Sequence, residues 1–333
     1  MVLKDVFKRP LLDLRISVTD RCNMRCRYCM PREHFDKNHV YLPKSDILSF
    51  EEIVRVVEAL LPAGLRKVRL TGGEPLIRKD LHKLIEQLRE LSPELDIALT
   101  TNAHLLSKSI QRLKQAGLSR ITVSLDAIDV DVYQAMGDTT STPDSIIESI
   151  DKTLALGIPV KVNTVIQKGI NEDQVMPLIS QMGSRNVPIR FIEYMDVGAT
   201  NSWNLEHVVT GEELRHKIGK EFGSIQPIKP DHPSDVARTY CTDSGYVIGF
   251  IESISKPFCG DCSRARLSAN GSIFTCLFAT EGFDLRGILR MNASKNELST
   301  AISAIWGQRK DRYSETRSEK TNLKRIEMSF IGG

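Results

Sequence analysis

The chain has 333 residues, of which 41% are hydrophobic, enough for a buried core, so it is not a disordered chain. Its 45 basic and 42 acidic residues leave a net charge of only +3, so no overall basic field favours nucleic acid as a partner. Residues 1–10 are charged and contain no apolar segment typical of a signal peptide, and no apolar run approaches a membrane span. We therefore expect a cytoplasmic protein with neither a nucleic-acid nor a membrane partner.

The first three-fifths of the chain alternate between apolar strand patterns and amphipathic helix patterns. Strands are predicted at 11–19, 67–71, 96–100, 120–125, 160–166 and 188–194, and helices at 50–61, 81–91, 108–116, 145–157 and 173–182. This alternation predicts an α/β fold in which helices cover a parallel sheet. Sites in such sheets form at the carboxyl ends of the strands, where polar residues gather in this chain: Thr19, Thr71, Thr100, Ser124 and Asn163.

The alternation stops near Gly198. A capping-box pattern at Thr210 and Glu213 predicts a helix over 210–220, and hairpins are predicted at 237–253 and 264–277. Helices follow to about residue 312, and the chain ends on Gly332 and Gly333 after an apolar stretch. We therefore divide the chain into a first domain, 1–198, and a C-terminal extension, 199–333.

The seven cysteines indicate metal binding or catalysis, because disulfides are rare in the cytoplasm. Cys22, Cys26 and Cys29 directly follow the first strand, at a spacing that can wrap one iron–sulfur cubane and leave its fourth iron open. Clusters with a structural or electron-transfer role usually have four protein ligands, so this spacing favours chemistry at the open iron. The alternative is a structural zinc site with His34 as the fourth ligand.

The second triplet, Cys259, Cys262 and Cys276, also has metal-site spacing, and a zinc ribbon completed by Cys241 is its alternative reading. Arg264 and Arg266 follow it on a strand, where they point to the same side and suit a phosphate. The plainer reading of these two arginines is a solvated strand face. A pair of glycines at 72–73, after the second strand, allows close approach of a ligand or forms an ordinary turn.

The first triplet, followed by Met30-Pro31, resembles the signature of the radical S-adenosylmethionine (SAM) superfamily. The resemblance becomes specific when the motifs are taken in order along the whole chain. They are similar to those of the molybdenum cofactor biosynthesis protein A family, the GTP 3′,8-cyclases. The motifs are residues 14–20, Gly72-Gly73-Glu74-Pro75, Thr100-Thr101-Asn102, Ser124-Leu125-Asp126, 161–163, 190–195, the second triplet with Arg264 and Arg266, and the terminal Gly-Gly.

The resemblance implies a partial, open, six-stranded TIM-like barrel and a C-terminal α+β extension carrying a second iron–sulfur cluster. It implies one [4Fe–4S] cluster on Cys22, Cys26 and Cys29 and another on Cys259, Cys262 and Cys276. The implied SAM contacts are Tyr28, Gly73, Ser124 and Met195. The implied GTP contacts are Arg15, Arg69, Thr100, Lys161, Arg264 and Arg266. Catalytic roles are implied for Arg15, Gly332 and Gly333, while Glu74 is expected to be structural.

The implied reaction is a lyase reaction in molybdenum cofactor biosynthesis. A 5′-deoxyadenosyl radical removes hydrogen from C3′ of GTP, and the product is (8S)-3′,8-cyclo-7,8-dihydroguanosine 5′-triphosphate. We expect the two clusters to face each other across the barrel mouth. The implied partners are an electron donor, the cyclic pyranopterin monophosphate synthase that handles the product, and a second copy in a homodimer.

The chain departs from the family pattern at two positions: Ala103 replaces the usual glycine after Thr-Thr-Asn, and Cys241 matches no motif. The first departure is expected to shift a loop modestly. Two other functions remain alternatives. One is a peptide-modifying radical SAM maturase with an auxiliary cluster, which gives no reason for phosphate-suited residues. The other is a zinc or iron–sulfur scaffold without turnover, which metal analysis distinguishes.

Overall fold

The computed structural model describes residues 2–230, 234–317 and 325–332. The described residues form one sheet in the strand order β12-β11-β10-β1-β2-β3-β4-β5-β6-β9-β8-β7. Its bounds are β1 (Asp13–Ser17), β2 (Lys67–Thr71), β3 (Asp96–Thr101), β4 (Arg120–Ser124), β5 (Val160–Ile166), β6 (Ile189–Glu193), β7 (Ile225–Ile228), β8 (Arg238–Thr242), β9 (Val247–Ile251), β10 (Arg264–Leu267), β11 (Ser272–Phe274) and β12 (Phe283–Asp284). The α/β class and the mostly parallel sheet are as predicted.

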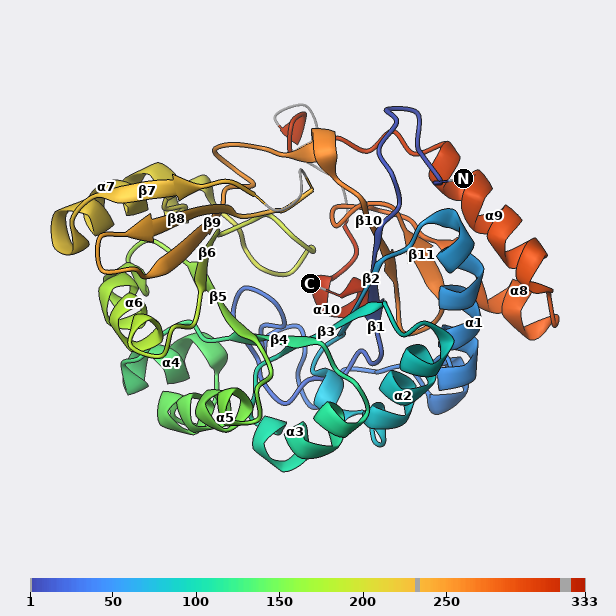
Figure 1. Ribbon diagram of the computed structural model, residues 1–333, viewed down its shortest axis with the longest axis horizontal. Coiled ribbons are helices and arrows are strands. Elements are labelled where there is room, and N and C mark those ends of the chain that lie inside the picture. The colour runs from blue at the N-terminus through green and yellow to red at the C-terminus, as the bar shows by residue number, and fades with distance from the viewer. Residues whose placement is uncertain (1, 231–233, 318–324, 333) are drawn as a thin grey trace.

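The strands β1 to β6 follow one another in chain order, each parallel to its neighbour. They alternate with α1 (Phe50–Leu60), α2 (Leu81–Leu91), α3 (Leu106–Gln115), α4 (Val130–Gly137), α5 (Pro143–Ala155) and α6 (Val175–Gly183). These helices lie on the outer side of the curved sheet (Figure 1). All were predicted except α4, a helix of eight residues that is too short for a clear apolar period.

Local sequence explains these elements. The predicted capping box of α1 is present, because Ser49 and Glu52 exchange side-chain and backbone hydrogen bonds. In β5, alternate residues such as Val160 and Val162 are buried, whereas Lys161 and Asn163 point into the interior of the curve. The outer face of the sheet therefore packs on helices, and the inner face presents polar side chains.

The C-terminal strands join both edges of the same sheet. The hairpins β8–β9 and β10–β11 were predicted, but the parallel pairing of β10 with β1 and of β9 with β6 was not. The short strands β7 and β12 were also not predicted. These pairings connect segments far apart in the chain, and local patterns carry no information about them.

The remaining helices are α7 (Gly211–Phe222), α8 (Arg286–Arg290), α9 (Lys295–Gly307) and α10 (Met328–Ile331). The predicted capping box of Thr210 and Glu213 begins α7. The short helix α10 lies on the inner side of the curved sheet, beside β1 (Figure 1). No helix in the described ranges has both the length and the apolar character needed to cross a membrane.

Candidate active site

The inner face of the sheet surrounds a cavity of about 830 Å³. Both cysteine triplets line it, and so do the residues that were expected to contact SAM and GTP. These are Arg15, Tyr28, Arg69, Gly73, Thr100, Ser124, Lys161, Met195, Arg264 and Arg266. The sequence motifs, which are scattered along the chain, therefore converge on one space.

The first triplet lies on the loop after β1. The backbone N–H groups of Cys29 and Met30 both donate to the carbonyl of Cys26, which closes a tight turn. Arg25 fixes the loop from outside by donating to the carbonyls of Cys22 and Phe35. His34 is exposed and does not line the cavity, so the zinc alternative lacks its fourth ligand here.

The three thiols of this loop suit a cationic cluster. Burial raises the pKa of Cys22 to about 11, and burial also raises the pKa values of Cys26 and Cys29 well above the ordinary value of a thiol. Thiolate charge on the neighbouring cysteines adds to the shift, because the like charges repel. Among the described residues, no three His, Cys, Asp or Glu side chains converge on a single ion position, as a zinc site would require. The donor set therefore fits a polynuclear centre that replaces three protons.

The Gly72-Gly73 turn packs directly against this loop. The N–H of Gly73 donates to the carbonyl of Thr19 at 3.0 Å, and that of Glu74 donates to the carbonyl of Arg21 at 2.8 Å. A Cβ at Gly73 would lie 2.2 Å from the Arg21 carbonyl oxygen, and Gly72 has a φ of +145°. Both positions therefore require glycine. The structure shows a turn packed closely against the protein's own backbone, and the approach of a ligand to these glycines stays a prediction.

Glu74 connects this turn to the end of β3. Its buried carboxylate accepts hydrogen bonds from the Thr101 hydroxyl at 2.7 Å and from the N–H groups of Asn102 and Leu76 at 2.8 and 3.0 Å. Burial raises the pKa of this carboxyl to about 7. These contacts suit the structural role expected for Glu74. Nearby, Ala103 is fully buried with a φ of +65°, a left-handed conformation that favours glycine and costs alanine about 1–2 kcal/mol.

Two further polar groups flank the cysteine loop. The Tyr28 hydroxyl donates to a carboxylate oxygen of Asp126 at 2.6 Å, and Asp126 also accepts from the N–H of Val165. The amide of Asn102 donates to Asn23 at 2.8 Å and lies 3.9 Å from Cys22 Sγ. In the sequence, Asn102 and Asp126 were noticed only as parts of motifs and were not predicted to be site residues. Their positions just after β3 and β4, at the carboxyl ends of the strands, could have indicated that they lie in the site.

A row of three arginines crosses the middle of the cavity. Arg266 on β10, Arg15 on β1 and Arg69 on β2 are direct partners in the parallel register. Burial is the main cause that lowers their pKa values, to about 9 for Arg15 and about 10 for Arg69, and the charges of neighbouring arginines contribute. Among the described residues, one nitrogen of each guanidinium has no hydrogen-bond partner. The like charges of these three guanidinium groups repel one another, and a bound anion would offset this repulsion.

Further cations lie toward the amino ends of the strands. Lys67, Arg120 and Arg190 also line the cavity. Asp13 lies 3.9 Å from Lys67, Asp96 pairs with Arg120 at 2.6 Å, and the negative charge of Asp235 acts on Arg190. Sequence analysis did not identify Lys67 or Arg120, and it quoted Arg190 only within the motif 190–195. The spacing of Lys67 and Arg69, two residues apart on a strand, places both on one face and could have revealed the first.

The two triplets lie at opposite ends of the parallel strands. The first follows the carboxyl end of β1, whereas Cys262 precedes the amino end of β10, which runs parallel to β1. β11 runs antiparallel to β10 and brings Cys276 back to that amino end. The two sets of cysteines therefore do not lie together at the barrel mouth, where the two clusters were expected to face each other. A strand of five residues separates the two levels by about 16 Å, and the arginine row lies between them.

The thiols of the second triplet differ in their electrostatic environment. Burial alone would raise the pKa of Cys262, but the charges of Arg264 and Arg309 lower it to about 6. Burial raises the pKa of Cys276 to about 12. Cys241 lies on β8 and does not line the cavity, so the four-cysteine zinc ribbon is not supported.

The C-terminal tail enters the same space. Met328 and Ser329 of α10 line the cavity, and Ile331 is fully buried. Gly332 has a φ of +78°, and a Cβ at this position would lie 2.5 Å from the Thr71 methyl group. Gly333, the other predicted glycine, lies outside the described residues.

Polar contacts hold the tail in this position. The Glu327 carboxylate accepts hydrogen bonds from the N–H of Ala199 and the hydroxyl of Thr200, both on the loop after β6. On the same loop, Asp196 accepts a hydrogen bond from Tyr313 and forms ion pairs with Arg317 and Arg325. Arg317 and Arg325 flank the undescribed segment 318–324. The loop after β6 therefore anchors the chain on both sides of that segment.

The comparisons with known proteins agree with this geometry. Residues 16–182 match the Radical SAM superfamily model, and residues 187–315 match the model called Molybdenum Cofactor Synthesis C. Among solved structures, SuiB of Streptococcus suis bound to S-adenosylmethionine has a TM-score of 0.62 at 17% identity, covering 94% of this chain and 69% of that chain. SuiB bound to the precursor peptide SuiA has a TM-score of 0.61 at 16% identity, covering 98% and 73%. At this identity these structures support the fold alone, and the fold with its cysteine loop defines the class as a radical SAM enzyme.

Full-length relatives narrow the class. The GTP 3′,8-cyclase of Staphylococcus haemolyticus (strain JCSC1435) is 46% identical, and that of Staphylococcus aureus (strain Newman) is 45% identical. In both cases the similarity covers 99% of this chain and 99% of the relative. The chain belongs to the family of the GTP 3′,8-cyclases.

Proposed function

We propose that this protein converts GTP to (8S)-3′,8-cyclo-7,8-dihydroguanosine 5′-triphosphate, the first step of molybdenum cofactor biosynthesis. One observation carries the proposal: a single cavity has a thiol triplet at each end and a row of arginines between them. A triphosphate is the ligand that best relieves such a row, because guanidinium groups bind phosphate oxygens in a bidentate geometry. The names of the full-length relatives point to the same substrate.

The proposed cofactors are two [4Fe–4S] clusters and SAM. Cys22, Cys26 and Cys29 would hold the first cluster, and the second would be held by Cys259, Cys262 and Cys276. When bound, the first cluster and SAM supply a radical that removes a hydrogen atom from the substrate ribose. The protein positions the reactants and excludes water, since the difficult chemistry belongs to the cofactor.

The proposed contacts follow the levels of the cavity. Tyr28, Gly73, Ser124 and Met195, near the first triplet, would contact SAM. The GTP contacts would be Arg15, Arg69, Thr100, Lys161, Arg264 and Arg266, and the base would approach the open iron of the second cluster. Cations that fix the phosphates hold the ribose within reach of the radical and replace a bimolecular encounter by a positioned one. Arg15, Gly332 and Gly333 are proposed to be catalytic.

The wider organisation is also a proposal. Residues 1–198 would form a partial six-stranded barrel, and residues 199–333 an extension that carries the second cluster and the tail. A cytoplasmic homodimer would receive electrons from a donor protein and would release its product to cyclic pyranopterin monophosphate synthase. The rival function, a peptide maturase, offers no role for Arg15, Arg69 and Arg266.

The decisive experiment is anaerobic incubation of the reconstituted protein with SAM, a reductant and each common nucleoside triphosphate in turn. The cyclised product should form only from GTP, and the protein should hold about eight iron and eight sulfide per chain, as two cubanes require. Zinc in place of iron would contradict the proposal, as would turnover of a peptide without GTP.

Two cysteine variants test the assignment of the triplets. Cys22→Ser should abolish SAM cleavage, because the cluster that splits SAM loses a ligand. Cys276→Ser should retain some uncoupled cleavage to 5′-deoxyadenosine and form no cyclised nucleotide. Equal cleavage by the two variants would show that the triplets are misassigned.

A further inference from the structure

A buried charged network lies behind the second cysteine triplet, on the side away from the arginine row. Asp5, Arg9 and Arg309 have exposed fractions of only 6%, 3% and 4%. Arg309 lines the cavity beside the second triplet, whereas Asp5 and Arg9 do not reach it, and none of the three is among the proposed GTP or SAM contacts. Burying charged groups usually costs more than their pairing returns, so a network of this kind has little value for stability alone.

Arg9 joins the N-terminal segment to the first ligand of the triplet. Its Nε donates to Asp5 at 2.6 Å, and its Nη1 donates to the carbonyls of Cys259 and Asp311, both at 2.8 Å. The backbone carbonyl of Arg9 accepts in turn from the indole of Trp306 on α9 at 3.1 Å. The N-terminal segment is thus fixed between the cysteine loop and α9.

Arg309 contacts the second ligand directly. Its Nη2 donates to Cys262 Sγ at 3.2 Å, and its Nη1 donates to the Cys262 carbonyl at 2.8 Å. The same guanidinium stacks on Trp306 at 4.5 Å and pairs with Asp5 at 3.4 Å. With the ring on one side and the carboxylate on another, the guanidinium is held in one orientation.

The third ligand segment is tied in through Asp311. The hydroxyl of Thr275, the residue before Cys276, donates to the Asp311 carboxylate at 2.6 Å. Asp311 also lies 3.5 Å from Nε of Arg309. The network therefore reaches every segment that carries a cysteine of the second triplet.

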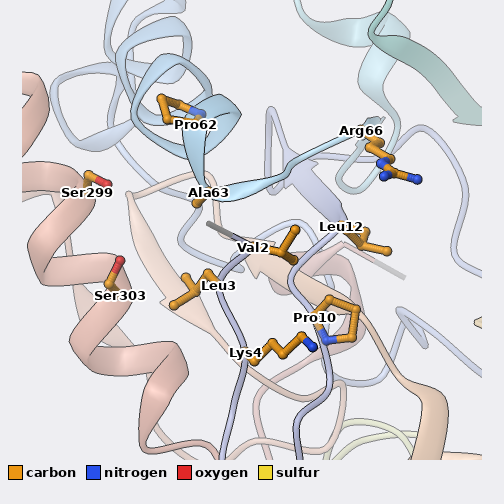
Figure 2. A pocket seen from close by; sticks show the side chains of 10 residues that line it. All are labelled: Val2, Leu3, Lys4, Pro10, Leu12, Pro62, Ala63, Arg66, Ser299 and Ser303. Atoms are coloured by element: carbon orange, nitrogen blue, oxygen red, sulfur yellow. The ribbon is translucent and has the colours of Figure 1, made fainter.

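The N-terminal segment has no other visible chemical role. A cavity of about 940 Å³ lies between this segment, the end of α1 and α9, and Figure 2 shows Leu3 and Lys4 passing beside Pro10. Its lining contains no thiol, carboxylate or imidazole, and Lys4 and Arg66 are its charged groups. This cavity offers nothing that would act on a substrate, so the segment matters through the contacts of Asp5 and Arg9.

We infer that Arg309, oriented by Asp5, is a positioning residue that tunes the second cluster through its hydrogen bond to the Cys262 sulfur. A donated N–H and a fixed positive charge favour the more negative, reduced state of a cluster, so they raise its reduction potential. Outer partners of this kind also slow metal loss, because they hold the ligand in its bound geometry. The inference rests on the proposed function, which supplies the second cluster.

The test uses the full chain with Cys22, Cys26 and Cys29 changed to alanine, so that all bound iron belongs to the second triplet. In this background, Arg309→Gln removes the positive charge. Arg309→Lys keeps the charge but lacks the planar guanidinium group that can donate to two acceptors at once. Arg312→Gln is the matched control, because Arg312 lies on the same segment, is half exposed and pairs with Glu315. The readouts are the potential of the cluster, from a redox titration followed by electron paramagnetic resonance, and the rate of iron transfer to a chelator.

Arg309→Gln should lower the potential and speed iron release. Losing an outer partner of a metal ligand typically weakens metal binding by about tenfold or more, and we expect the release rate to rise by a similar factor. Arg309→Lys should fall between this variant and the parent, and Arg312→Gln should match the parent. If Arg309→Gln fails to fold, Asp5→Asn supplies the same test, because it leaves Arg309 without its anchoring carboxylate.

The outcomes separate the inference from the proposed function. A parent protein that binds no iron at the second triplet would overturn both. A bound cluster whose potential is the same in the parent, in Arg309→Gln and in Asp5→Asn would overturn the inference alone. Faster iron release without any change in potential would reduce Arg309 to a structural role and would also refute it.

Discussion

The substitution Gly332→Ala should displace the C-terminal tail without unfolding the protein. Gly332 has a φ of +78°, and an added Cβ would lie 2.5 Å from the methyl group of Thr71. Thr71 is buried at the end of β2, where the strand ladder fixes its backbone. Neither the tail nor the wall of the cavity can therefore absorb the extra atom without moving.

The magnitude follows from two terms. The positive φ costs alanine about 1–2 kcal/mol. Overpacking against a fixed neighbour adds about 1–3 kcal/mol. Their sum, about 2–5 kcal/mol, lowers the ratio of docked to free tail by roughly 30-fold or more, since about 1.4 kcal/mol corresponds to a factor of ten. If the tail acts in catalysis as proposed, the cyclised product should fall in proportion once the free tail dominates.

The assay pairs amide hydrogen exchange of residues 328–332 with product formation from GTP. Thr71→Ser removes only the methyl group that clashes. The double variant, Gly332→Ala with Thr71→Ser, should therefore recover docking of the tail except for the cost of the positive φ at residue 332. Thr71→Ser alone should resemble the parent. Unchanged exchange in Gly332→Ala, or a double variant no better than the single one, would refute the steric argument. Full activity with a freely exchanging tail would refute the catalytic role instead.

Three further predictions concern the arginine row, a buried carboxyl and a surface helix. Arg266→Ala should weaken GTP binding about tenfold or more, because a charge-assisted phosphate contact is worth about 1.5–3 kcal/mol. SAM binding, measured by calorimetry as well, should be unchanged. If the variant binds GTP as tightly as the parent, Arg266 is a strand residue with no role in phosphate binding. Burial raises the pKa of Glu74 from 4.5 to about 7, so the native state holds the proton more tightly than the unfolded state. The free energy of unfolding should therefore fall by about 3 kcal/mol as the pH rises from 4.5 to 7, and urea melts of Glu74→Gln should lack this part of the slope. Gly219→Ala in α7 meets no atom within 4 Å and should raise the melting temperature through a gain of up to about 1 kcal/mol; a lower temperature would show that the helix needs the glycine.

Much of the secondary structure could be predicted from local sequence patterns. The strands β1 to β6 and most of their helices agree with the apolar periods, and the capping boxes at Ser49 and Thr210 begin helices as predicted. The hairpins β8–β9 and β10–β11 also form where turn residues indicate them. These features depend on residues only a few positions apart, so a single sequence is enough to find them.

The site needed more than local pattern. The spacing of the cysteines indicated two centres, and the order of the motifs indicated the family, but neither gave the relative positions of the centres. The parallel pairing of β10 with β1 decided that the triplets lie at opposite ends of the strands and that Arg266 lies beside Arg15. Strand partners are chosen by the packing of the whole sheet, which short-range patterns do not record.

The network behind the second triplet had no signal in the sequence at all. Asp5, Arg9 and Arg309 are charged residues near the two ends of the chain, and in isolation each looks like a solvated side chain. Their burial and their contacts with Cys259 and Cys262 exist only because the N-terminal segment packs against α9. The sequence by itself therefore determined most of the elements, the candidate ligand cysteines and the family. The tertiary structure decided which charges share a buried site, since burial depends on neighbours that are distant in the chain.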